Sequence, residues 1–384
     1  MPSVLSVVKR NFMPARLIVA ASDSNADQLY ATGFHVPDAF AFVESGGRTA
    51  ILLSNLEVDR GRKQARVDLV EAYADYEALV RRRKKAEPTF AEVVAAFAKK
   101  HKAARPHVPA DFPCGLAAAL AAAGVIVRPV EGHFWPQREI KTPAEIRALT
   151  TATRITELGM ERGVEILRAS AIRKDRRLDW NGVVLTAERL RAEIEAAMLF
   201  AGGFAANNSI VAGGGQACDP HERGHGPLKA NELIILDIFP RVAKSGFFGD
   251  LTRTVVRGTA DAAQRRLWET CFEGQRRALR ALAPGAEGKA IQDAVRDFFT
   301  ANGYPTEQKN GRWQGFFHGL GHGLGLELHE EPRIAKTTLR AGQVFTVEPG
   351  IYVPGIGGVR HEDVVAITAR GHRMLSRFPK SLEL

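Results

Sequence analysis

Two short stretches of the chain share one outline, and this outline restricts the possible folds more than any other feature. "ANELIILDIF" (residues 230–239) and "AGQVFTVEPG" (residues 341–350) each run four strand-forming residues into an acid, Asp237 and Glu348, 111 residues apart. A second acid follows each of them, Asp250 after 13 residues and Glu362 after 14, and opens another β-branched run. This repeated pattern predicts a duplicated unit, in which a pseudo-twofold pair of hairpins brings four carboxylates toward one another.

The four acids lie at strand ends in apolar surroundings, and such a cluster needs an explanation. For any one acid alone, a solvated turn or edge position is the better interpretation. A buried group of carboxylates repels itself and costs several kcal/mol unless it is paired or binds metal. Four acids in a duplicated arrangement therefore favour a functional site.

The stretch "FHGLGHGLGLELHEEP" lies between the second and third acid and places His318, His322 and His329 among closely spaced glycines. Glycine lets the backbone approach a site closely, and three imidazoles in twelve residues are hard to assign to packing. Carboxylates with an imidazole form an oxygen-rich site that suits Mn²⁺, Co²⁺ or Fe²⁺. Two bridging carboxylates would hold two ions roughly 3.5 to 4 Å apart, the spacing of hydrolytic two-metal sites.

The chain has 384 residues, of which 45% are hydrophobic and 25% charged, as in a globular protein with two domains. No apolar run reaches the roughly 18 residues of a membrane helix, so we expect a cytoplasmic protein without a membrane segment. Three cysteines without CxxC spacing indicate neither disulfides nor a zinc knuckle. The net charge of +10, densest in "RRRKK" (residues 81–85), favours a solvated face over nucleic-acid binding, because no aromatic residues are interleaved with it.

Residues 15–135 alternate strand-like and helix-like segments, with a Gly-Gly hairpin signal at residues 46–47 and a capping box from Thr89 to Glu92. A long helix is predicted to begin after Thr142, because Pro143 suits the first helical position and Glu145 completes a capping box. We therefore expect an α/β domain over residues 1–140 and a second domain over residues 141–384. Helical spacing also predicts two apolar faces in the second domain: Leu190, Ile194 and Ala197, and Ile291, Val295 and Phe298.

Several motifs of the chain resemble the pita-bread metallopeptidases, which include prolidase, aminopeptidase P, methionine aminopeptidase and the metal-free creatinase. The matching pieces are "LDIF…FGDLTRT", "HGLGHGLGLELHE", "TVEPGIY", "GGVRHED" and "REIKTPAEIRAL". The resemblance covers essentially the whole chain and implies a creatinase-like α/β N-terminal domain followed by an α+β pita-bread catalytic domain with pseudo-twofold hairpins. An N-terminal domain of this size indicates the prolidase or aminopeptidase P branch.

The resemblance implies five metal ligands: Asp237, Asp250, His322, Glu348 and Glu362. Asp250 and Glu362 would bridge two divalent ions, with Asp237 at the first ion and His322 and Glu348 at the second. Mn²⁺ is the favoured metal, and Co²⁺, Fe²⁺ or Zn²⁺ are the alternatives. Because creatinase lacks these ligands and this chain has all five, a metal-free enzyme is disfavoured.

The resemblance also implies catalytic and substrate-binding residues. His221, 16 residues before Asp237, matches a histidine near the scissile bond, and His329 matches one that contacts substrate and transition state. His318 matches a substrate-binding position, and Arg360 matches an arginine that orients the bridging carboxylate. Glu348 is the expected proton carrier. His225 and His361 have no matching role and are interpreted as solvated or rim residues.

The resulting prediction is a metallopeptidase of the Xaa-Pro class that uses a metal-bridging hydroxide on proline-containing di- or oligopeptides. A dipeptidase (prolidase) is preferred over an aminopeptidase P that takes longer peptides, and a homodimer is what the family implies. The rival interpretation is a non-catalytic pita-bread scaffold that binds nucleic acid or protein, which the charge of +10 would suit. One departure from the family pattern is "DIFPR" after Asp237, where a glycine turn is usual, so the pocket wall at residues 239–248 is expected to differ.

Overall fold

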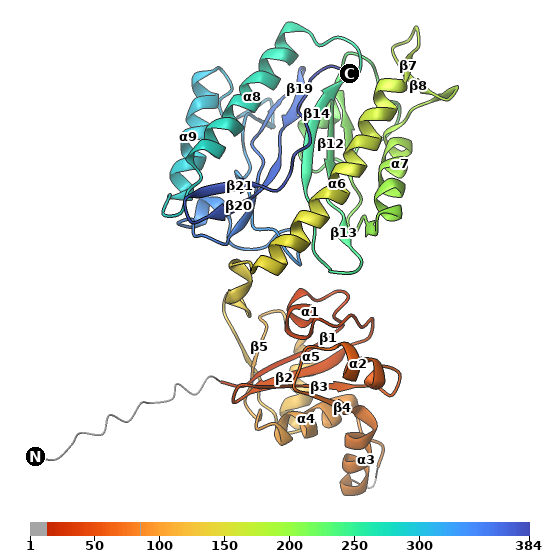
Figure 1. Ribbon diagram of the computed structural model, residues 1–384, viewed down its shortest axis with the longest axis vertical. Coiled ribbons are helices and arrows are strands. Elements are labelled where there is room, and N and C mark those ends of the chain that lie inside the picture. Colours follow the sequence, from red (N-terminus) through yellow and green to blue (C-terminus); the bar gives the residue numbers. More distant parts are fainter. Residues whose placement is uncertain (1–13, 85) are drawn as a thin grey trace, which may run out of the picture. The chain divides into compact units, whose positions relative to one another are not determined.

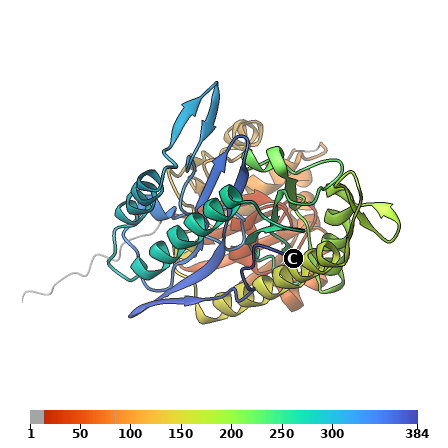
Figure 2. The ribbon, with the colours of Figure 1, turned by 90° about the horizontal axis from the view of Figure 1, so that it is seen from above.

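The computed structural model describes residues 14–84 and 86–384, and Figures 1 and 2 show it from two directions. Lys85, the last residue of the basic run, lies outside the described residues. The chain forms two compact units, of which the first ends at Pro136 and the second begins at Gln137. Within the described ranges, no helix combines the length and apolar composition that crossing a membrane requires.

A six-stranded sheet with the order β4-β3-β2-β1-β5-β6 is the centre of the first unit. Its strands are β1 (Arg16–Ala20), β2 (Phe40–Ser45), β3 (Arg48–Leu53), β4 (Leu69–Ala72), β5 (His107–Val108) and β6 (Arg128–Pro129). Its helices are α1 (Ala26–Thr32), α2 (Val58–Gln64), α3 (Tyr73–Lys84), α4 (Phe90–Lys100) and α5 (Cys114–Ala122). The hairpin at Gly46 and Gly47 and the capping box that begins α4 are both confirmed.

Four helices and three 3₁₀ turns accompany the strands of the second unit. They are α6 (Pro143–Ala169), α7 (Ala187–Phe200), α8 (Ala262–Ala281), α9 (Gly288–Ala301), η1 (Pro136–Glu139), η2 (Gly214–Cys218) and η3 (Ile334–Lys336). Thr142 and Glu145 form the predicted capping box of α6. Met198 on α7 and Phe299 on α9 are fully buried, whereas the predicted Ala197 and Phe298 beside them are half-buried. Phe298 still packs against the core under α8 and α9.

The strands of the second unit form several small sheets. Three-stranded sheets have the orders β11-β12-β14, β17-β20-β21 and β7-β8-β9, and two-stranded sheets pair β10 with β13, β15 with β16 and β18 with β19. Their bounds are β7 (Ala171–Ile172), β8 (Leu178–Trp180), β9 (Val183–Val184), β10 (Gly203–Phe204), β11 (Ile210–Gly213), β12 (Leu233–Ile238), β13 (Arg241–Val242), β14 (Leu251–Val256), β15 (Glu307–Lys309), β16 (Arg312–Gln314), β17 (Val344–Val347), β18 (Gly350–Val353), β19 (Gly357–Arg360), β20 (Asp363–Thr368) and β21 (Gly371–Met374). Figure 2 shows the β15–β16 hairpin projecting from this unit.

The predicted duplicated unit corresponds to two antiparallel strand pairs, β12 with β14 and β17 with β20. Asp237 is the second-last residue of β12 and Glu348 directly follows β17, while Asp250 and Glu362 directly precede the returning strands. Figure 1 shows these strands between α6 and α7 on one side and α8 and α9 on the other. The two pairs therefore present all four acids at comparable strand ends.

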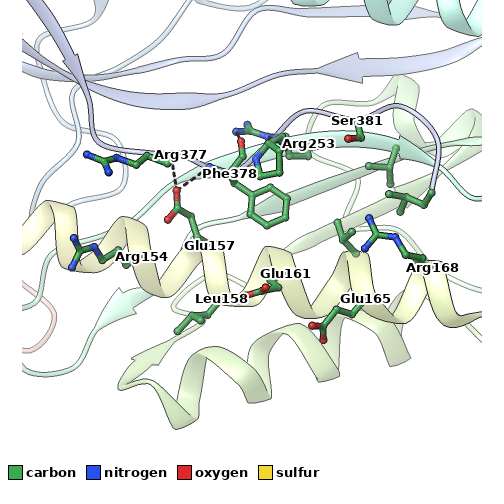
Figure 3. Close-up of a pocket in the computed structure, with 14 residues that line it drawn as sticks. Arg154, Glu157, Leu158, Glu161, Glu165, Arg168, Arg253, Arg377, Phe378 and Ser381 are labelled. Atoms are coloured by element: carbon green, nitrogen blue, oxygen red, sulfur yellow. Dashed lines mark hydrogen bonds between the residues drawn. The ribbon is translucent and has the colours of Figure 1, made fainter.

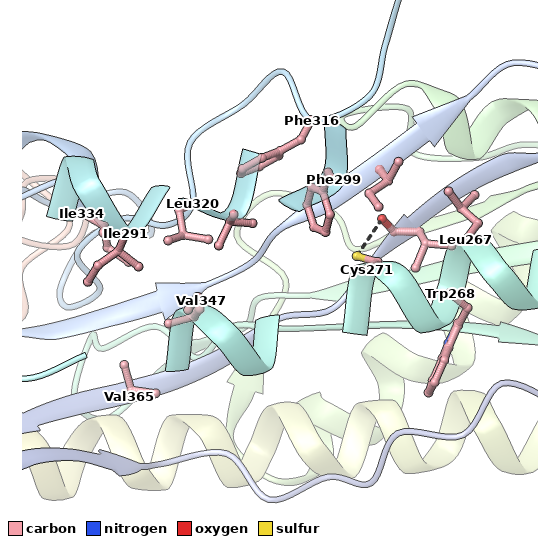
Figure 4. Packing of buried hydrophobic residues seen from close by; sticks show 14 of the residues in the cluster. Leu267, Trp268, Cys271, Ile291, Phe299, Phe316, Leu320, Ile334, Val347 and Val365 are labelled. Atoms are coloured by element: carbon pink, nitrogen blue, oxygen red, sulfur yellow. Dashed lines mark hydrogen bonds between the residues drawn. The ribbon is translucent and has the colours of Figure 1, made fainter. Parts of the chain in front are cut away.

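Two apolar cores hold the strand pairs in place, one under α6 and α7 and one under α8 and α9. In the second core, Phe299 and Phe316 pack edge to face with ring centroids 5.7 Å apart (Figure 4). Cys271 lies in the same core, with its thiol 3.6 Å from the carbonyl oxygen of Val359 (Figure 4). All three cysteines are free, as expected.

A cavity of about 680 Å³ lies between α6 and the C-terminal segment (Figure 3). Glu157 on α6 accepts hydrogen bonds there from the backbone amides of Arg377 and Phe378. None of the predicted site residues lines this cavity. It is thus separate from the site described next.

Candidate active site

All residues that line a second cavity, of about 830 Å³, belong to the second unit. Its wall includes every residue that the sequence predicts for the site: His221, Asp237, Asp250, His318, His322, His329, Glu348, Arg360 and Glu362. His221 comes from the loop after η2, and the others come from strand ends of both halves and from the glycine-rich stretch between them. The tertiary structure thus brings the predicted residues to one place.

The ligand atoms of Asp250, His322 and Glu362 form the tightest group, all within 4.8 Å of one another. Nε2 of His322 lies 3.7 Å from a carboxylate oxygen of Asp250 and 3.2 Å from Oε1 of Glu348. Nδ1 of His322 is 3.0 Å from the carbonyl oxygen of Gly323 and donates to it, because a carbonyl oxygen can only accept, and Nε2 faces the acids. Asp237 lines the same cavity but lies outside this tight group.

Buried like charges dominate the electrostatics of the cavity. Burial, and then the neighbouring Glu362, raises the pKa of Asp250 well above its ordinary value. Burial, and then Glu348, does the same to the pKa of Glu362. Arg360 is the one buried guanidinium in the wall of this cavity, so the four carboxylates exceed the buried positive charge. Such a group favours the binding of cations.

The hydrogen bonds of Asp237 indicate whether these residues suit a metal ion. Its Oδ2 accepts a hydrogen bond of 2.6 Å from Arg360, whereas its buried Oδ1 has no hydrogen-bond partner among the described residues. A buried carboxylate oxygen without a partner is costly unless a cation binds it. Together with the oxygen-rich ligand set, this fits hard or borderline divalent ions rather than a thiolate site.

Arg360 connects the metal-ligand candidates to a substrate-binding candidate. Its Nη1 donates to the hydroxyl of Tyr352 at 2.8 Å, and that hydroxyl lies 3.0 Å from Nε2 of His318. Because the hydroxyl accepts from Arg360, its proton is directed at His318. Burial lowers the pKa of His318 to about 4, so this imidazole is neutral near pH 7.

The sequence analysis missed three residues that form hydrogen bonds to predicted site residues: Tyr352, Thr252 and Thr346. Thr252 Oγ1 donates to Glu362 at 2.7 Å, and Thr346 Oγ1 donates to Glu348 at 3.0 Å. Each threonine lies two residues from an acid, on the same face of its strand, and this spacing was the available signal.

His361 corrects one expectation. It was interpreted as a solvated or rim residue, but it is fully buried, with its ring 4.7 Å from that of Trp268 and 5.7 Å from that of Phe272. It directly follows Arg360, the last residue of β19, and its side chain points away from the cavity into the core under α8. His225 is exposed, as expected.

The segment after Asp237 differs from its counterpart after Glu348. In the second half, β18 and β19 form a hairpin between Glu348 and Glu362. In the first half, the short β13 pairs instead with β10, and the amide of Phe248 donates to the carbonyl of Gly325 at 2.8 Å. Phe239 lines the cavity, together with the apolar side chains of Phe317 and Leu328. The "DIFPR" variation therefore places an aromatic wall beside the acids.

Gly321 gives a first testable prediction. A Cβ at this position would lie 1.9 Å from the carbonyl oxygen of Thr346, so Gly321→Ala must displace the backbone that carries His322. We expect a stability loss of about 1–3 kcal/mol and weaker metal uptake, measured by urea unfolding and by metal titration. Gly319→Ala is the matched control, because a Cβ at this position would lie 4.0 Å from the nearest atom. Equal stability of the two variants would contradict the close approach.

Comparison with known proteins agrees with this geometry. The model of metallopeptidase family M24 matches residues 147–369. The Xaa-Pro dipeptidase of Pyrococcus furiosus is 32% identical over 250 residues, which are 64% of this chain and 65% of that relative, just under two thirds of its length. The Xaa-Pro dipeptidase of Lactobacillus helveticus is 30% identical over 256 residues, 64% of this chain and 62% of that relative.

Solved structures match over nearly the whole chain. An X-Pro aminopeptidase from Thermotoga maritima has a TM-score of 0.80 at 23% identity and covers 97% of this chain and 98% of that one. An Xaa-Pro dipeptidase from Bacillus anthracis has a TM-score of 0.79 at 25% identity, covering 97% and 95%. The predicted fold, an N-terminal α/β domain followed by a pita-bread domain, is confirmed by these neighbours. With more than half of its residues matched by the family model, the chain belongs to metallopeptidase family M24.

Proposed function

We propose that this protein is a dinuclear-metal exopeptidase that hydrolyses Xaa-Pro bonds, with dipeptides preferred as substrates. The observation that carries the proposal is the cavity in which four carboxylates and an imidazole converge, in a chain related to named Xaa-Pro dipeptidases. Residues 141–384 are proposed as the catalytic domain, because all residues that line the cavity come from this part of the chain. A homodimer and a cytoplasmic location belong to the same proposal.

Five residues would hold two divalent ions, with Mn²⁺ favoured: Asp237, Asp250, His322, Glu348 and Glu362. When bound, such ions acidify a water and polarise a substrate carbonyl. The carboxylate of Glu348, which accepts a hydrogen bond from Thr346, would accept a proton and pass it to the leaving proline nitrogen. His221 and His329, both exposed at the cavity wall, would donate hydrogen bonds to the developing oxyanion.

The preference for dipeptides is supported by two cations in the cavity wall. Arg333 and Lys336 both line the cavity, and neither forms an ion pair with any acid in the described part of the chain. A dipeptide carries its free carboxylate directly on the proline, within reach of such cations, whereas a longer peptide places an amide there. The alternative is an aminopeptidase P that takes longer peptides, in which case these cations would not select the substrate.

The experiment that tests the function measures cleavage of Ala-Pro, Gly-Pro and an Xaa-Pro-Pro tripeptide, with and without added Mn²⁺. We expect metal-dependent cleavage, with the dipeptides preferred. Cleavage of the tripeptide alone would select aminopeptidase P. Absence of metal-dependent cleavage of any of them would rule out the peptidase and leave a non-catalytic binding scaffold.

Arg333→Met gives a second prediction, specific to the dipeptide preference. Loss of a charge-assisted contact of roughly 1.5 kcal/mol should raise KM for Ala-Pro by about tenfold. KM for Ala-Pro amide, which has no carboxylate to bind, should change little. The measurement is the ratio of the two KM values, and Arg370→Met, at an exposed position outside the cavity, is the control. An equal effect on both substrates would show that Arg333 does not bind the carboxylate.

A further inference from the structure

We propose that Lys141 and Glu330 form a buried ion pair that positions the loop carrying His329 in the active-site cavity. The inference deepens the proposed function and rests on it, because it assigns two positioning residues to the same reaction. Neither residue lines the cavity, so both would act through the loop. The pair joins positions that are 189 residues apart in the sequence.

Glu330 is the most fully hydrogen-bonded acid of this loop. Its Oε2 accepts from Nζ of Lys141 at 2.7 Å, and its Oε1 accepts from Nη2 of Arg138 at 2.5 Å. Oε1 also accepts from the backbone amides of Leu326 at 2.7 Å and Glu327 at 3.1 Å. One carboxylate thus ties two cations from one segment to two amides of the loop.

The pair lies in the interior, where its loss has a large effect. The side chain of Lys141 is 3% exposed and that of Glu330 is 4% exposed. A Cβ on Gly325 would lie 2.4 Å from Oε2 of Glu330, so the carboxylate packs directly on the glycine backbone of the loop. Removing one partner would leave the other charge buried and unpaired, which is strongly unfavourable.

Apart from the carboxylate of Glu330, the loop is held by backbone hydrogen bonds: the amide of Glu330 donates to the carbonyl of Gly323, and the amide of Phe248 donates to the carbonyl of Gly325, both at 2.8 Å. The loop contains no helix or strand between Gly323 and Pro332, and its ends are joined by the bond from the amide of Gly323 to the carbonyl of Pro332, 3.0 Å. The ring of His329 packs against that of His322 at 4.4 Å but makes no hydrogen bond to any described residue. The position of His329 in the cavity therefore depends on the backbone of its loop, which Glu330 fixes from the next position.

The segment that carries Lys141 is itself held in place. The amide of Lys141 donates to the carbonyl of Gly342 at 2.8 Å, and Arg340 binds Glu139 at 2.5 Å. Directly afterwards, the capping box at Thr142 begins α6, a helix of 27 residues. The segment at residues 138–141 is therefore a fixed support, to which the loop is anchored.

The test is Lys141→Met, which keeps the apolar stem and removes the charge. We expect kcat on Ala-Pro to fall by about 10- to 100-fold, as for other residues that orient an active-site group. KM should change by less than about threefold, because a contact made mainly in the transition state is lost. Metal content should equal that of the wild type. Hydrogen exchange at the amides of residues 326 and 327 should accelerate by roughly tenfold or more.

Two further variants make the result specific. Lys141→Arg, which keeps a cation at this position, should recover a large part of kcat and of the amide protection. Arg147→Met removes an exposed cation near the start of α6 without touching the loop or its support and should leave both unchanged. Lys141→Met could accelerate hydrogen exchange throughout the protein. In that case Arg138→Met, which removes the second cation, should accelerate exchange at residues 326 and 327 locally and by a smaller factor.

Wild-type kcat in Lys141→Met, or unchanged exchange at residues 326 and 327, would overturn the proposal. Hydrogen exchange separates this outcome from a failure of the proposed function. If the wild type cleaves no Xaa-Pro peptide, the proposed function is lost, and the exchange of the loop amides still decides whether the ion pair positions the loop.

Discussion

Asp250→Asn is expected to abolish binding of at least one metal ion and to lower turnover of Ala-Pro by more than about a hundredfold. The change removes one carboxylate from the tightest ligand group of the cavity, and an amide is a weaker ligand for a divalent ion. Removal of residues that only orient ligands already costs roughly 10- to 100-fold in metal affinity or activity, so loss of a ligand should cost more.

The same variant should behave differently with and without metal. In metal-free protein, Asp250 is buried beside Glu362, so replacing it with a neutral residue should leave stability unchanged or raise it. A hundredfold excess of Mn²⁺ over Kd should stabilise the wild type by about 2.7 kcal/mol and raise its Tm, and should stabilise the variant less. Asp297→Asn, at an exposed position on α9, is the control. A variant with two bound metals and the wild-type rate would show that the ligand assignment is wrong.

Arg360→Met is expected to destabilise the metal-free protein by about 3–5 kcal/mol, the usual cost of breaking a buried ion pair by removing one partner. Arg360 is 3% exposed and donates to both Asp237 and Tyr352. Its loss leaves four carboxylates around the cavity without a buried cation. The measurement is urea unfolding in the presence of a chelator, because bound metal would replace the missing charge in part.

A double-mutant cycle separates the charge of Arg360 from its volume. Asp237→Asn on the Arg360→Met background should recover part of the stability, because the oxygen that Arg360 binds is then neutral. Arg370→Met, at an exposed position, should change stability by no more than about 0.5 kcal/mol. Additive effects of the two buried substitutions would contradict the ion pair as the source of the loss.

Local patterns in the sequence determined much of what the structure contains. The capping boxes at Thr89 and Thr142 and the Gly-Gly hairpin depend on neighbours within a few residues, so short-range rules are sufficient for them. The duplicated outline placed Asp237 and Glu348 at the ends of buried strands, because alternation and turn residues decide where a strand stops. The helical faces were correct in their first two positions; in the third, Ala197 and Phe298 are only half-buried, and the neighbouring Met198 and Phe299 are fully buried.

Contacts between distant segments were decided only by the tertiary structure. Thr252 holds an acid 110 residues away, Lys141 pairs with Glu330 across 189 residues, and His361 is buried against α8 rather than solvated. The local sequence around each of these residues is compatible with solvent exposure, so no periodicity reveals the partner. The sequence by itself determined which residues end the strands and can carry the chemistry. The packing of the two halves decided which side chains hold them in place, because a buried polar group is stabilised by whichever partner the fold brings to it.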